Sequence, residues 1–211
     1  MYQVQKDLDK EAARITNVVV MGIGEPFDNY ENLSKFIKII NDKNCRNLGM
    51  RNITVSTCGL APMIEKFGQD FPQVNLAISL HAPNNDIRNS MMPVNKSYPI
   101  EVLVETCRKY AKDTSRRVTF EYTLVKGVND SKNHALELAS LLKGMLCHVN
   151  LIPANEVPEK GHERSSDNDI QNFKNILERA GHTVTIRRTL GSDINASCGQ
   201  LRREKMKENN A

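Results

Sequence analysis

The chain has 211 residues, of which 39% are hydrophobic and 26% are charged, and its formal net charge is +4. This composition is ordinary for a globular protein, and the charge is mildly basic rather than histone-like, which permits a nucleic-acid partner without requiring one. The sequence has no apolar run long enough to cross a bilayer and no signal peptide, so we expect a cytoplasmic protein without a membrane partner.

Apolar runs that predict β-strands alternate with segments whose apolar residues recur at helical spacing. The first run, residues 15–21, is continuous and β-branched, which predicts a strand buried on both faces. Strands are predicted at residues 15–21, 52–57, 74–80, 118–125, 147–152 and 183–188, and helices around residues 3–14, 33–40, 62–67, 100–111, 138–142 and 170–180. This alternation predicts a parallel α/β architecture, either a barrel or an open doubly wound sheet.

Residues suited to ligand binding follow nearly every predicted strand, which favours the barrel. In a barrel the loops after all strands meet at one site, whereas an open sheet concentrates ligand contacts at a single switch point. The residues at these strand ends are Gly24, Glu25, Ser56, Ser79, His81, Asn129 and Asn155.

Cys198 lies in a run of small and polar residues, GSDINASCGQL, which predicts a loop. A thiolate on such a loop can act as a nucleophile, although most free cysteines are small buried hydrophobes. Basic residues flank the loop, at Arg187 and Arg188 before it and in residues 202–207 after it. They suit a phosphate backbone or, equally, form a solvated, frayed terminus.

The five cysteines, Cys45, Cys58, Cys107, Cys147 and Cys198, show no zinc-type spacing. We therefore expect reduced thiols and no metal ligands among them.

Five motifs together resemble the radical S-adenosylmethionine methyltransferases of the RlmN/Cfr type. In order, they are VVVMGIGEP, ITVSTCG, AISLHAPN, the pair NDS and NLIPAN, and DINASCGQL, and the resemblance covers nearly all of the chain. Pro26 and the last motif are more similar to the RlmN branch. That branch implies a radical SAM barrel and methylation of C2 of adenosine in large-subunit (23S) rRNA and some tRNAs. The alternatives are a C8-directed Cfr-type methyltransferase, a non-catalytic RNA-binding remnant and an unrelated barrel enzyme such as an aldolase or isomerase.

The resemblance also implies roles for individual residues. Gly24 and Glu25 match the segment that holds the methionyl amino group of S-adenosylmethionine, and Cys198 matches the cysteine that carries the methyl group as S-methylcysteine. Further contacts to S-adenosylmethionine are implied for Ser56, Ser79, Leu80, His81 and Asn155. The family also uses a [4Fe–4S] cluster and a reductant protein such as flavodoxin.

The sequence departs from this family in its cysteines, because the family's CxxxCxxC cluster motif does not occur. The resemblance therefore implies a C-terminal part of such an enzyme, with the cluster ligands, the resolving cysteine, an RNA-binding domain and the first barrel strand all preceding Met1. We expect an incomplete barrel over residues 1–190 and a loop with the methyl-carrier cysteine and a basic tail over residues 191–211. Alone, the chain is expected to be marginally stable or oligomeric, to bind no cluster and to be inactive.

Overall fold

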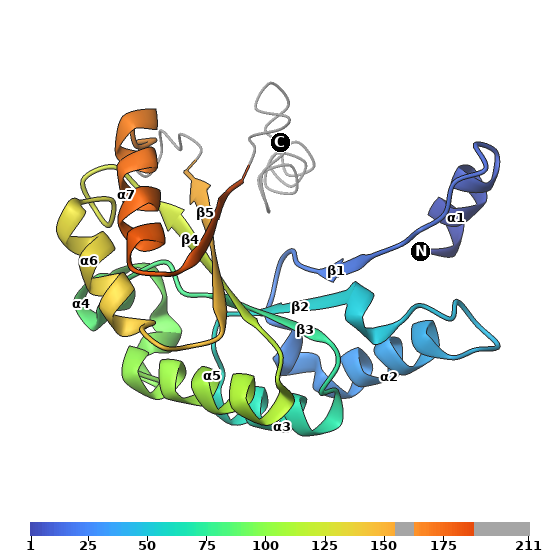
Figure 1. Ribbon diagram of the computed structural model, residues 1–211. Helices are drawn as coiled ribbons and strands as arrows, with labels where there is room; N and C mark the ends of the chain where they lie inside the picture. The colour runs from blue at the N-terminus through green and yellow to red at the C-terminus, as the bar shows by residue number, and fades with distance from the viewer. Residues whose placement is uncertain (155–162, 188–211) are drawn as a thin grey trace, which may run out of the picture.

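Six parallel strands form one sheet, and their order in space is their order in the chain, β1-β2-β3-β4-β5-β6. The computed structural model describes residues 1–154 and 163–187. The strands are β1 (Val18–Val20), β2 (Ile53–Thr57), β3 (Asn75–Ser79), β4 (Val118–Leu124), β5 (Cys147–Pro153) and β6 (Thr183–Ile186). This sequential winding confirms the predicted barrel-type α/β fold, since a doubly wound sheet reverses its strand order. Within the described ranges β1 and β6 each pair on one side only, so the curved sheet in Figure 1 is open.

Most helices lie on the outer, convex side of this sheet, while α1 lies apart from them, beyond the amino-terminal end of β1 (Figure 1). The helices are α1 (Tyr2–Asp9), α2 (Tyr30–Asn41), α3 (Ala61–Asp70), α4 (Asn85–Met91), α5 (Ile100–Thr114), α6 (Lys132–Leu141) and α7 (Asp167–Arg179). Short 3₁₀ segments occupy Pro26–Asn29, Met50–Asn52 and Pro93–Lys96. Among the described helices, none has the length and apolar character needed to cross a membrane.

The hydrophobic core lies between the sheet and these helices, and the strands alternate accordingly. In β4 the side chains of Val118, Phe120, Tyr122 and Leu124 are buried, whereas the residues between them are only half-buried. The same period of two holds in β2 and β5, as expected for strands with one covered face. We call the sheet face opposite these helices the inner face; its side chains are largely polar.

The prediction that the first strand is buried on both faces was wrong. β1 is only three residues long, and Val19 on its inner face is 60% exposed. Val18 and Val20 are partly buried against the core. The apolar run is continuous, yet in the described part of the chain the strand is an edge that pairs with β2 alone, so its inner face carries an exposed valine.

Local hydrogen bonds determine where some helices begin and end, and at the end of the first helix the structure differs from the sequence prediction. The first helix ends at Asp9 rather than near residue 14, and the side chain of Gln5 then bonds the backbone of Ala13 and Ile15. Helix α6 begins after Ser131, whose hydroxyl accepts a hydrogen bond from His134 N at 3.2 Å and caps the helix. Helix α4 was not predicted from the sequence.

Candidate functional site

Apart from Asn129, which follows β4, the predicted ligand-binding residues in the described ranges come from the carboxyl ends of β1, β2 and β3. These strands are adjacent and parallel, so their ends lie at one edge of the sheet. Glu25 joins the first two ends: its carboxylate accepts hydrogen bonds from Phe27 N at 3.0 Å and from Cys58 N at 2.7 Å. The carboxylate thus fixes the loop after β1 against the loop after β2, and each oxygen keeps a lone pair for a further donor.

Gly24 gives the first loop its shape. Its φ of +92° lies in the left-handed region that favours glycine, and a Cβ added there would meet no atom within 4 Å. The neighbouring backbone is therefore open to close approach by a ligand.

His81 is held in one conformation, with an uncommon positive φ of 57°. Its Nδ1 accepts a hydrogen bond from Thr123 N at 3.1 Å, and its carbonyl oxygen accepts one from Asn129 Nδ2 at 2.7 Å. Because Nδ1 is an acceptor, a neutral ring carries its proton on Nε2. Burial, together with the positive charge of Arg88, lowers the pKa of His81 to about 4, so the imidazole stays neutral and offers one N–H donor.

Two serine hydroxyls at the ends of neighbouring strands are candidates for hydrogen bonds to a ligand. Ser56 in β2 and Ser79 in β3 are half-buried, and within the described residues neither hydroxyl makes a hydrogen bond. Leu80 differs from them, because its side chain is fully buried in the core. The Leu80 N–H donates to Glu121 O at 3.1 Å, and the Leu80 carbonyl oxygen accepts a hydrogen bond from Arg88. These two bonds fix the backbone where β3 ends and the loop that contains His81 begins.

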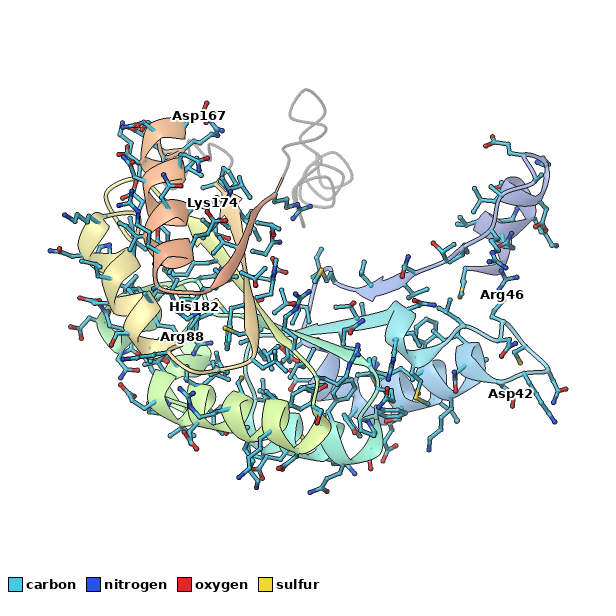
Figure 2. All side chains as sticks on the ribbon, in the orientation of Figure 1. Asp42, Arg46, Arg88, Asp167, Lys174 and His182 are labelled. Carbon is cyan, nitrogen blue, oxygen red and sulfur yellow. The ribbon has the colours of Figure 1, made fainter. Side chains whose placement is uncertain are left out.

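Arg88 on α4 supports the loop that follows β2 and the loop that follows β3. It was not predicted from the sequence. Its guanidinium is fully buried and donates to the carbonyl oxygens of Cys58 at 2.7 Å, Leu80 at 3.2 Å and Ser79 at 3.3 Å. A fourth hydrogen bond, of 2.9 Å, reaches Asn95 Oδ1. Figure 2 shows Arg88 within the layer of helices. No carboxylate forms a salt bridge with it in the described part of the chain.

Two other residues at this edge serve the structure. Asn129, predicted as a ligand-type residue, is fully buried, and its side chain bonds His81 O, Thr123 O and Val125 N. It therefore supports His81, and its amide is already engaged. Burial and the Glu25 carboxylate raise the pKa of Cys58 to about 12, which keeps this thiol protonated and unreactive.

The groups at this edge fit S-adenosylmethionine in chemical type. A carboxylate and an open glycine backbone suit an ammonium group, while the two hydroxyls and the imidazole N–H suit ribose and carboxylate oxygens. The open space beside Gly24 and the unengaged hydroxyls of Ser56 and Ser79 are what such a ligand needs.

A [4Fe–4S] cluster does not fit the described residues. Residues 1–154 and 163–187 contain no group of three or more His, Cys, Asp or Glu side chains that could hold a metal ion. Cys107 and Cys147 are buried in the core, Cys58 is half-buried and Cys45 is exposed. The predicted residues Asn155 and Cys198 lie outside the described residues.

Comparison with known proteins shows the family to which the chain belongs. Residues 3–139 match the Radical SAM superfamily. The chain is 55% identical over 201 residues to a probable dual-specificity RNA methyltransferase RlmN of Caldanaerobacter subterraneus subsp. tengcongensis, covering 95% of this chain and 59% of that protein. It is also 55% identical over 207 residues to the protein of the same description from Clostridium novyi, covering 98% and 60%. The chain thus spans about three fifths of the length of these relatives.

Solved structures show the same fold. A radical SAM methyltransferase from Sphaerobacter thermophilus superposes with a TM-score of 0.90 at 48% identity, covering 94% of this chain and 58% of that one. A domain of pyruvate-formate lyase-activating enzyme from Bacteroides vulgatus has a TM-score of 0.65 at 20% identity and shares the fold alone. The chain therefore belongs to the Radical SAM superfamily, within which it is similar to RNA methyltransferases of the RlmN type.

Proposed function

We propose that this chain is the S-adenosylmethionine-binding and methyl-carrying part of an RlmN-type enzyme that methylates C2 of adenosine in 23S rRNA and in some tRNAs. The observation that carries the proposal is a set of polar groups on adjacent strand ends that have no hydrogen-bond partner among residues 1–154 and 163–187: the hydroxyls of Ser56 and Ser79 and the Nε2–H of His81. They occur in a sequence 55% identical to named RlmN proteins.

In this proposal, residues 1–190 form the binding barrel and residues 191–211 carry the acceptor cysteine. Gly24 and Glu25 receive the methionyl amino group, whose protons meet the remaining lone pairs of the Glu25 carboxylate. Ser56, Ser79, Leu80, His81 and Asn155 make the further contacts. Cys198 is assigned as the thiolate that would form an S–CH3 bond with the electrophilic methyl group of bound S-adenosylmethionine, whose own S–CH3 bond would break to leave S-adenosylhomocysteine.

No residue of this chain is assigned to a [4Fe–4S] cluster, because the cysteine spacing and the described residues do not fit one. The proposal includes this consequence: the chain alone binds no cluster, and methylation of rRNA or tRNA requires cluster ligands and a reductant protein such as flavodoxin from outside it. Because the proposed substrates are RNAs, we expect the protein to act in the cytoplasm.

Equilibrium dialysis with labelled S-adenosylmethionine tests the binding site. Wild-type chain should bind, and Ser79→Ala should weaken binding about 2- to 10-fold, because one hydrogen bond contributes about 0.5–1.5 kcal/mol. Ser90→Ala is the matched control, since Ser90 is exposed on α4 and its hydroxyl bonds only Ile87 O. Absence of binding to the wild-type chain, or equal affinities for wild type and Ser79→Ala, would contradict the proposed site.

Two further measurements address the finer parts of the proposal. Anaerobic reconstitution with iron and sulfide should give no iron-dependent absorbance, and appearance of that absorbance would overturn the cluster statement. Intact-mass analysis with peptide mapping should find any enzyme-borne methyl group on Cys198. A methyl group mapped to another cysteine would remove Cys198 from its assigned role.

A further inference from the structure

A row of polar side chains crosses the inner face of the sheet at the level of Ser79. Parallel pairing sets Ser79 of β3 opposite Glu121 of β4, Glu121 opposite Asn150 of β5, and Asn150 opposite Thr185 of β6. Side chains of paired residues on one face stand about 5 Å apart. The row therefore begins at a predicted S-adenosylmethionine contact and continues over three further strands, none of which carries an assigned ligand residue at this level.

Hydrogen bonds along this row all point toward Glu121. Asn150 Nδ2 donates to Glu121 Oε2 at 2.8 Å, and Thr185 Oγ1 donates to Asn150 Oδ1 at 3.0 Å. Because the single hydroxyl proton of Thr185 is used in that bond, His148 Nε2, at 2.8 Å from Thr185 Oγ1, must be the donor of the next one. The Nδ1 atom of His148 is left buried without a hydrogen-bond partner in the described structure.

This chain of donors orients the Glu121 carboxylate. Oε2 is engaged by Asn150, and no hydrogen bond or ion pair within the described residues engages Oε1. Burial raises the pKa of Glu121, while the hydrogen bond from Asn150 and the positive charge of Arg187 act in the opposite direction. A half-buried carboxylate with one open oxygen costs free energy unless a donor completes it.

Glu121 is also joined to the predicted ligand loop through its backbone. Its carbonyl oxygen accepts hydrogen bonds from Leu80 N at 3.1 Å and from His81 N at 3.2 Å. The side chain of Glu121 thus starts from the strand that holds this loop, beside Ser79. A ligand that reaches the Ser79 hydroxyl comes within reach of the neighbouring carboxylate.

We propose that Glu121, oriented by the Asn150–Thr185–His148 chain of hydrogen bonds, accepts hydrogen bonds from the hydroxyl groups of a ribose diol in a ribonucleoside bound at this edge of the sheet. A carboxylate is the usual acceptor for ribose hydroxyls in nucleotide sites, because it offers several lone pairs and no competing proton. The inference deepens the proposed function and rests on it for the identity of the ligand. Two sources supply this chemistry, the ribose of S-adenosylmethionine and that of a substrate RNA nucleotide.

The test combines a protein variant with removal of a ligand hydroxyl, in binding assays by isothermal titration calorimetry. One arm compares S-adenosylhomocysteine with its 2′-deoxy and 3′-deoxy analogues, and the other compares an RNA hairpin with the same hairpin carrying 2′-deoxyadenosine at the target position. A hydrogen bond to a charged group corresponds to a loss of about 10- to 100-fold for the wild-type chain when its hydroxyl is removed. In Glu121→Gln this loss should shrink to about 2- to 10-fold, because the glutamine amide oxygen still accepts a hydrogen bond but carries no negative charge.

Control variants separate this role from a structural one. Glu105→Gln, on the exposed side of α5, should leave every affinity unchanged. Asn150→Ala keeps the carboxylate but removes its orienting donor, so it should reduce the hydroxyl discrimination partially. Should Glu121→Gln fail to fold, Asn150→Ala decides: a partial loss of hydroxyl discrimination supports the role of Glu121, and discrimination equal to that of the wild type overturns it.

The outcomes are distinct. Loss of discrimination in the first arm assigns the diol to S-adenosylmethionine, and loss in the second assigns it to RNA. Equal discrimination by wild type and Glu121→Gln in both arms, or none in the wild type, overturns the inference while leaving the proposed function intact. Failure of the wild-type chain to bind S-adenosylhomocysteine overturns the proposed function instead, and the RNA arm then tests Glu121 by itself.

Discussion

Replacing Arg88 with methionine should destabilise the fold strongly, although Arg88 forms no salt bridge in the described structure. Methionine fills a similar volume, so the change removes the guanidinium and leaves little cavity. Four acceptors then lose their donor: the carbonyl oxygens of Cys58, Ser79 and Leu80, and the Oδ1 atom of Asn95.

The expected loss follows from these four bonds. A buried acceptor left without its donor costs about 1–3 kcal/mol, and the lower end applies where a carbonyl retains a second partner. Four such acceptors give about 4 kcal/mol, which is reduced because methionine has no buried charge to desolvate. We therefore expect a loss of about 2–4 kcal/mol in the free energy of unfolding, near the upper end for point substitutions.

Urea denaturation followed by circular dichroism measures this loss. With a slope of about 2 kcal/mol per molar urea, the midpoint should fall by about 1–2 M. Arg51→Met is the matched control, because Arg51 is exposed and its Nε bonds only the Gln73 side chain, so its midpoint should hardly move. Equal midpoints for the two variants would refute the view that Arg88 holds the strand-end loops together.

Three further outcomes are expected. His81 has a pKa of about 4 in the folded chain against an ordinary 6.5, so the unfolded chain binds its proton first; stability should fall as the pH is lowered from about 6.5 to 4, and titration of His81→Asn should show a smaller slope. Gly59→Ala should destabilise more than Gly144→Ala in thermal melts, because its Cβ would lie 2.9 Å from the Leu103 side chain whereas that of Gly144 meets nothing, and both have positive φ. Ser131→Ala removes a helix cap and should cost about 1 kcal/mol in urea unfolding, whereas no loss would show that the cap is dispensable.

The strands could be predicted from the sequence because each is a short apolar run that ends at a polar or glycine-containing turn. Five of the six observed strands begin and end within about two residues of their predicted bounds. The first differs more, since the exposure of Val19 depends on the strand's place at the edge of the sheet. Position within a sheet is a tertiary property that a run of valines does not encode.

The candidate site was predictable in part, for a similar reason. Gly24, Ser56 and Ser79 stand at strand ends, where sequence reasoning looks for ligands. Arg88 and Glu121 were missed because their importance comes from contacts with residues distant in the chain. An arginine in a polar helix and a glutamate that alternates with apolar residues both resemble ordinary solvent-exposed positions.

Sequential strand order has a consequence for how the chain acquires its structure. Among the described strands, each one after β1 pairs with the strand that precedes it, and a single stretch of chain connects the two. Long-range contacts therefore span one strand–helix–strand unit at a time, which keeps the entropy of loop closure low at each step. The sheet can grow from one neighbour to the next as the chain leaves the ribosome, without waiting for its far end. Each newly added strand then serves as the template for the one that follows.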